Sequence, residues 1–191
     1  MHISSLARRL AVVAALTVVG VGMVAAQGVG AAPVPAPDFT CGVTVFTPCN
    51  QTAHFSDINQ TGTPFANAPS CPAFITTDYV TLIGSGNGVE HSIINNAGDG
   101  WFTSTFTGTV TITPYLDAGL TTPDPNVLPF TGHLTQWFGG SFNKNNFVFH
   151  FTFHFDGTAA DGTTLRVLDV SHTNSSASAV GPPHSFEITR C

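Results

Sequence analysis

Two stretches of the chain alternate between apolar and polar residues, and this period of two constrains the fold more than any other feature. In residues 101–113, even positions carry Phe, Ser, Gly, Val and Ile, and odd positions carry threonine from Thr103 onward. In residues 147–155, phenylalanine occupies every odd position. Side chains alternate across an extended strand, whereas a helix would scatter them around its circumference. Both stretches are therefore predicted to be strands with one apolar face.

Shorter patterns of the same kind predict the remaining strands, at residues 80–83, 89–94, 131–138, 163–172 and 185–190. Turn residues lie between them, and the glycine cluster Gly84, Gly86 and Gly88 is interpreted as a tight turn or bulge. Seven or eight antiparallel strands must each bury one face, by curling into a barrel or by stacking two sheets. We predict a single antiparallel β-barrel, with a β-sandwich as the alternative, and no helix after the amino-terminal segment.

The first 26 residues have the order of a secretory signal, with Arg8 and Arg9 before an apolar run and small residues at its end. The run is close to the shortest that spans a bilayer, so cleavage after Ala26 or Ala32 is favoured over a membrane anchor. We predict a signal peptide at 1–26, a flexible Pro/Ala-rich leader at 27–39, an irregular disulfide-bearing segment at 40–72 and the barrel at 73–191. The processed protein is expected to be secreted, without a membrane span.

All four cysteines follow the signal, and an even number in an oxidising compartment predicts two disulfides. Three pairings are possible. We expect Cys41 to pair with Cys49 in a local loop, and Cys71 to pair with Cys191, because the second bridge brackets every strong strand. A zinc site is less favoured, since no C-x-x-C pair occurs.

Charged residues make up only 8% of the chain. Without the arginines of the signal, the chain has eleven carboxylate side chains and only three cationic ones, Lys144, Arg166 and Arg190. Such a chain has no cationic surface to displace the counterions of a phosphate backbone, which argues against nucleic-acid binding. The polar, nearly uncharged surface suits an extracellular protein.

Three stretches, 86–91 (GNGVEH), 95–106 and 132–143 (GHLTQWFGGSFN), resemble a group of exported actinobacterial β-proteins without an assigned function. The resemblance covers roughly two thirds of the chain after the signal. In architecture only, the strand pattern is similar to lipocalin-like barrels and to allene-oxide-cyclase or dirigent barrels. The lipocalin G-x-W motif near the first strand is missing. The resemblance therefore implies an exported β-fold and no chemistry.

Histidine is frequent for a chain with so few charges. His150 and His154 have the spacing of a helical zinc motif, but four residues of a strand span about 13 Å, so the two cannot share a metal ion. Each needs partners from neighbouring strands, and the candidates are His133, Arg166, Asp169 and His172. No metal site and no cofactor are predicted.

Acid-base chemistry requires a histidine beside a carboxylate. Glu90 and His91 are adjacent on a strand, so they point to opposite faces and cannot act together. His91 joins a neighbour such as Asp169 only if it points inward. The candidate catalytic residues are His91, His133, His150 and Asp169.

Five aromatic residues are expected to line the interior: Trp101, Trp137, Phe149, Phe151 and Phe153. A barrel lined by rings can leave a cavity for an apolar molecule. We therefore expect a secreted protein that binds a small hydrophobic ligand, which requires a void larger than a few waters. One alternative is an extracellular isomerase, cyclase or hydrolase that uses the His and Asp groups. The other is a cell-envelope interaction protein whose neutral Thr/Asn surface makes the contact.

Overall fold

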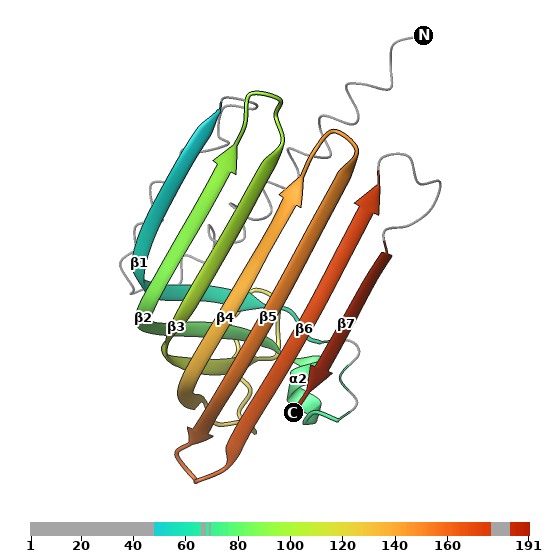
Figure 1. Ribbon diagram of the computed structural model, residues 1–191. Coiled ribbons are helices and arrows are strands. Elements are labelled where there is room, and N and C mark those ends of the chain that lie inside the picture. The colour runs from blue at the N-terminus through green and yellow to red at the C-terminus, as the bar shows by residue number, and fades with distance from the viewer. Residues whose placement is uncertain (1–47, 66–67, 69, 177–183) are drawn as a thin grey trace.

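A computed structural model of the chain describes residues 48–65, 68, 70–176 and 184–191. Seven strands pair in chain order in one antiparallel sheet (Figure 1). They are β1 (Cys49–Gly62), β2 (Tyr79–Ile94), β3 (Gly100–Tyr115), β4 (Phe130–Phe142), β5 (Asn146–Ala159), β6 (Thr164–Ser176) and β7 (His184–Arg190). The all-β, antiparallel prediction is confirmed, and the signal and leader predicted at 1–39 lie outside the described residues.

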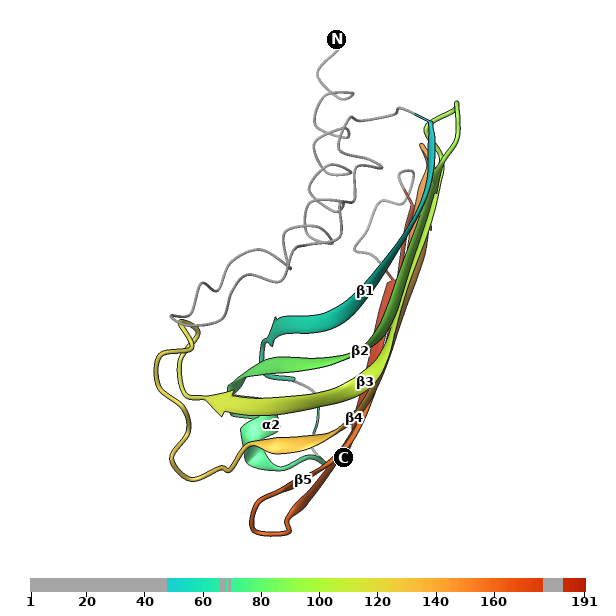
Figure 2. The same cartoon turned by 90° about the vertical axis from the view of Figure 1, so that its left-hand side faces the viewer.

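The sheet is open, so the predicted closure into a barrel is not seen. In the described residues no ladder joins β1 to β7, and β7 is a short edge strand that pairs only with β6. Figure 2 shows that the sheet is straight at one end and strongly bent at the other, where β1 to β3 curve around the short helix α2 (Ala73–Thr77). The helix was not predicted. It fills the concave side, where further strands would be needed to close a barrel.

Alternation gives the sheet an inner face on its concave side and an outer face on its convex side. The inner face carries the even residues of β3 and β4 and the odd residues of β5, which include the predicted apolar positions. The outer face carries the intervening residues, among them the β3 threonines. Residues from Phe102 to Ile112 alternate between buried and more exposed along β3, as the sequence pattern predicts, except at Gly108.

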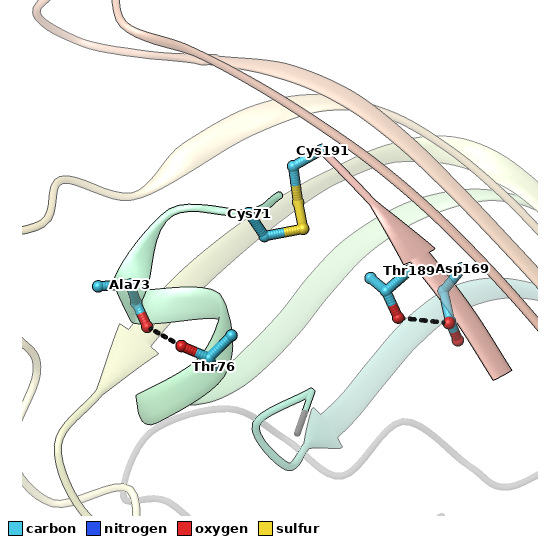
Figure 3. Close-up of a disulfide and its surroundings, with 6 residues drawn as sticks. All are labelled: Cys71, Ala73, Thr76, Asp169, Thr189 and Cys191. Carbon is cyan, nitrogen blue, oxygen red and sulfur yellow. Dashed lines mark hydrogen bonds between the residues drawn. A yellow bond between two sulfur atoms is a disulfide. The ribbon is translucent and has the colours of Figure 1, made fainter. Parts of the chain in front are cut away.

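The hydrophobic core lies on the inner face at the bent end. Phe155 and Leu134, which are opposite each other on β5 and β4, are completely buried there. The helix α2 covers them: Ile75 belongs to the core cluster, and the ring of Phe74 stacks on Phe130 with centroids 5.6 Å apart. The predicted Cys71–Cys191 disulfide is confirmed and ties the chain end to this region (Figure 3). Cys41, the expected partner of Cys49, lies outside the described residues.

The glycine cluster of β2 is not a turn, but the predicted bulge is present: the β1–β2 register shifts between the pairs Phe55–Gly88 and Asp57–Ser85, where the sheet bends (Figure 2). Gly84, Gly86 and Gly88 lie on the inner face of one continuous strand, β2. A Cβ atom at Gly86 would overlap the backbone of β3 at Thr107 and Gly108. Strands this close on the concave side have no room for side chains, so glycine permits the curvature.

Two boundaries also differ from the sequence expectation. Residues 49–62 form one strand of 14 residues within the segment 40–72, where an irregular path with one or two short strands was expected. Backbone pairing with β2 holds this stretch, whose own apolar pattern is weak. The strand β4 continues to Phe142, where a loop was expected from residue 139, and the turn is confined to the residues around Asn143.

Candidate functional site

The predicted ring-lined surface forms on the inner face, with Phe149 at its centre. Its ring contacts Phe102, Phe138 and Phe147, at centroid separations of 6.3, 6.4 and 6.5 Å. Phe151 and Phe153 continue the row along β5, and Phe153 reaches the buried core. Three of the five predicted lining residues, Phe149, Phe151 and Phe153, therefore point inward. We call Phe102, Phe138, Phe147 and Phe149 the phenylalanine cluster.

Polar side chains lie beside this cluster on the inner face. The hydroxyl of Ser104 donates a hydrogen bond of 3.3 Å to the carboxylate of Glu90, and burial raises the pKa of Glu90 above its ordinary value while this bond opposes the rise. The buried Gln136 has a side-chain oxygen, Oε1, without a hydrogen-bond partner. Ser104 and Gln136 also line a cavity of about 10 Å³, the room of a single water molecule. The void expected for an enclosed apolar ligand is not found among the described residues.

Asp169 is buried on the inner face, opposite Thr189 of the edge strand β7. The Thr189 hydroxyl donates a hydrogen bond of 2.8 Å to its carboxylate (Figure 3). Desolvation raises the pKa of Asp169, the Thr189 bond lowers it, and the negative charge of Glu187 adds to the rise. Among the described residues, the side chain that hydrogen-bonds the Asp169 carboxylate is thus the hydroxyl of Thr189, which joins β6 to β7.

The three candidate catalytic histidines lie on the outer face, so the sheet separates them from Asp169. His91 contacts the Thr52 hydroxyl through Nδ1 at 3.1 Å, and His133 contacts the Thr107 hydroxyl through Nε2 at 3.2 Å. His150 faces His172. The four candidates, of which at least two were expected to converge, are not brought together: Asp169 lies on the inner face, and the histidines contact different partners on the outer face.

Trp101 and Trp137 also lie on the outer face and do not line the interior. They are 44% and 37% exposed. Both belong to the positions between the inward-facing residues of β3 and β4, which is the same parity as the threonines. Each belongs to a group of ring side chains on the convex side.

These rings contact one another in two groups. His91 meets Trp101 edge-on, with centroids 5.5 Å apart. On the other side, His150 lies between Trp137 at 6.3 Å and His172 at 4.3 Å, and His172 contacts Phe186 at 5.8 Å. We call these six residues the aromatic band: His91, Trp101, Trp137, His150, His172 and Phe186.

Strand register explains why the two groups lie along one row across the sheet. His91, Thr103, Gly139, His150, His172 and Phe186 follow one another across β2 to β7 in a single row of paired residues. Gly139 contributes no side chain at the middle of this row, and a Cβ atom there would lie 3.1 Å from the Trp137 ring. The indole of Trp137 therefore lies against the backbone of the row.

The outer face around the band is apolar and uncharged. Among the described residues, ten large hydrophobic side chains are exposed, and eight of them point to this face: Ile83, Val89, Ile93, Trp101, Trp137, Leu168, Phe186 and Ile188. Its charged side chains lie toward the bent end, where Arg166 and Asp156 form an exposed ion pair of 3.0 Å. An exposed apolar surface of this extent is typical of an interaction site.

Sequence reasoning missed Phe186 and assigned the two tryptophans to the wrong face. The signal was present, because Trp101 has the parity of the threonines and Phe186 alternates with Ser185 and Glu187. The pairing of His150 with His172 was one of several options, since two Asp-Gly pairs offered two turns and therefore two registers.

Comparison with protein families, curated proteins and solved structures finds no match for this chain. The resemblance to exported actinobacterial proteins therefore stays a prediction. Among the described residues, no helix has the length and apolar character needed to cross a bilayer. In the same part of the chain, no group of three or more His, Cys, Asp or Glu side chains is placed to hold a metal ion.

Proposed function

We propose that this is an exported binding protein that docks a neutral, hydroxyl-rich polymer of the cell envelope on its outer face. The observation that carries the proposal is the exposure of Trp101 and Trp137 on an uncharged sheet surface rich in threonine. A sugar ring has apolar C–H groups on its faces and hydroxyls on its rim. Indole rings pack against the C–H groups, and threonine hydroxyls and imidazoles hydrogen-bond the sugar hydroxyls.

The spacing of the two indoles favours a polymer over a single sugar. Trp101 pairs with Ser141, which lies four residues from Trp137 on β4. Four residues of a strand extend about 13 Å. A ligand that packs on both rings therefore covers more than one sugar unit, and the threonines of β3 lie along the path between them.

The lack of charge narrows the chemistry of the partner. An acidic polymer would be expected to meet cationic side chains, and in the described part of the outer face these are Arg166 and Arg190, both toward the bent end. The Arg166 guanidinium is already engaged by Asp156. A neutral glycan requires no counter-charge, so it fits this surface better than an anionic one.

The experiment measures binding of the processed protein to soluble glucans, mannans and galactans by affinity electrophoresis and tryptophan fluorescence. We expect retardation by at least one neutral glycan, and a loss of affinity of about tenfold or more in Trp101→Ala and in Trp137→Ala. Leu116→Ala and Leu128→Ala are matched controls, because both side chains are exposed but lie in the loop between β3 and β4. Equal binding by the tryptophan variants and the controls would reject the proposal.

A second copy of the chain is the main competing occupant of an apolar sheet face, because two such faces would stack as a β-sandwich. Light scattering separates the two cases. If the wild type is a dimer, the tryptophan variants are monomers and no glycan binds, the outer face is a self-association surface. That result would overturn the glycan assignment.

As a second function, we propose that the open, concave surface of the inner face, and not an enclosed void, takes a small hydrophobic molecule with one hydrogen-bond donor; Phe138, Phe147 and Phe149 are partly exposed there. The phenylalanine cluster supplies apolar contact, and the unpaired Gln136 oxygen beside it supplies an acceptor. Phe149→Ala is expected to abolish binding of a fluorescent apolar probe, whereas Phe186→Ala on the outer face leaves it intact. The reverse pattern would remove the inner face from consideration.

We do not propose an acid-base enzyme. That function requires at least two of the four candidate side chains to converge in one cleft. Asp169 lies on the inner face, and the three histidines on the outer face each contact a different partner: Thr52, Thr107 and His172.

A further inference from the structure

His150 and His172 stand directly opposite each other on β5 and β6. Their Nδ1 atoms are 3.1 Å apart and their ring centroids 4.3 Å apart. His150 is exposed and His172 half-buried, so the two imidazoles are accessible from the convex side. From this geometry, we propose that the pair binds a divalent transition-metal ion, with Cu²⁺ preferred.

The separation of the two nitrogen atoms fits coordination to one ion. Imidazole nitrogen binds such ions at about 2.0 to 2.1 Å, so two nitrogens at angles between about 90° and 110° lie about 2.8 to 3.4 Å apart. The observed 3.1 Å falls inside this range. In the metal-free protein, one Nδ1–H donates to the other Nδ1. When the ion binds, that proton moves through water to Nε2 of the same ring, so both imidazoles stay neutral and both Nδ1 lone pairs become available. A small rotation about χ2, a soft torsion in histidine, then turns both lone pairs toward the ion.

The number of ligands decides which ion is preferred. The described residues place no third His, Cys, Asp or Glu at this position, so water or an external donor must complete the coordination. Structural zinc sites use four protein ligands, and catalytic zinc sites use three. With only two imidazoles, affinity depends on the intrinsic strength of the ion, which is greatest for Cu²⁺ in the first-row series.

The surroundings hold the two rings in place. Trp137 packs beside His150 and Phe186 beside His172, so the pair lies between two exposed aromatic side chains. Antiparallel pairing of β5 with β6 fixes the separation of the two backbones on either side of the pair. Both histidines are thus largely positioned before an ion arrives, which reduces the entropy cost of binding.

Trp137 provides a built-in reporter, because a bound Cu²⁺ ion quenches the fluorescence of an indole in contact with its ligand. The experiment titrates the full processed protein with Cu²⁺ in a non-chelating buffer and records fluorescence and the electron paramagnetic resonance spectrum. We expect one ion per chain, hyperfine coupling to two nitrogens, and weaker binding of Ni²⁺ and Zn²⁺. Trp137→Phe should remove most of the quenching and leave the resonance spectrum unchanged.

His150→Ala and His172→Ala should each weaken Cu²⁺ binding about 100-fold or more, because the second imidazole binds the ion intramolecularly in the native pair. His154→Ala is the matched control, since His154 lies on the same strand and the same face as His150, four residues further along. Unchanged affinity in both pair variants would overturn the proposal, as would an equal loss in the control. Circular dichroism and the melting temperature without metal establish that each variant is folded, and acidification should release the ion because protons compete for the same nitrogens.

Discussion

The Cys71–Cys191 bridge gives a quantitative test of how this sheet is stabilised, because it joins positions 120 residues apart. Replacing both cysteines with alanine removes a constraint from the unfolded chain. For a loop of about 120 residues, the chain-entropy model gives about 16 cal/mol/K, or about 5 kcal/mol at 25 °C. The total free energy of unfolding of a domain of this size is about 5 to 15 kcal/mol. The double variant is therefore expected to lose a third or more of its stability.

The measurement is urea unfolding, followed by circular dichroism and fluorescence and extrapolated linearly to water. A control variant, Ser70→Ala with Arg190→Gln, changes the exposed residue next to each cysteine and keeps the bridge. We expect this control to lie within about 0.5 kcal/mol of the wild type. Complete unfolding of the double variant in buffer would also fit a loss of the expected size.

A loss below about 1 kcal/mol, with an unchanged dependence on urea, would refute the reasoning. It would mean that the unfolded chain is compact enough to keep the two ends together without the bridge. Hydrogen exchange adds a local readout. Because β7 pairs only with β6, its amides should lose protection before those of β3 and β4 when the bridge is removed.

Three further predictions follow from burial and packing. Phe155→Ala should lower the free energy of unfolding by about 3 to 5 kcal/mol, because Phe155 is completely buried. Phe186 is half exposed on the outer face, so Phe186→Ala should lower it by less than about 1 kcal/mol. Similar losses for the two variants in urea unfolding would contradict the assignment of the two faces. Glu90→Gln should raise the melting temperature near neutral pH and have no effect below about pH 4. Burial raises the pKa of Glu90, so the neutral carboxyl stabilises the fold in acid, and this stabilisation is lost as pH rises through the folded-state pKa. A gain in melting temperature that persists in acid would show that the charge of Glu90 is not the cause. Gly86→Ala should destabilise by about 1 to 3 kcal/mol, since its Cβ atom meets the backbone of β3, and a neutral result would mean that the bend does not need glycine there.

Local alternation was enough to predict the strands that carry most of the fold. The threonine pattern of β3 and the phenylalanine pattern of β5 each assign two faces without any knowledge of the partner strand. The same rule does not give the curvature of the sheet. In sequence, the glycines of β2 fit a turn or a bulge equally well, and only the register of β1 and the close approach of β3 show that they lie in a bulged, bent strand.

The candidate site was predicted less well, because it depends on register and not on local pattern. His150 meets His172 only because the turn is formed at Asp161 and Gly162, where Gly162 has a positive φ of 88°. A turn at residues 156–157 would pair His150 with a different residue. The tryptophans were misplaced for another reason: their hydrophobicity suggested an interior position, while their parity with the threonines indicated the outer face.

Consecutive residues of β5 serve both candidate sites, since Phe149 belongs to the phenylalanine cluster and His150 to the aromatic band. One backbone therefore separates a ligand on the inner face from an ion or polymer on the outer face. Any ligand that shifts β5 against β6 alters affinity across the sheet, and thermodynamic linkage makes that effect equal in both directions. In such a protein, binding of a ligand to one face of the sheet changes the affinity of the other face for its own ligand.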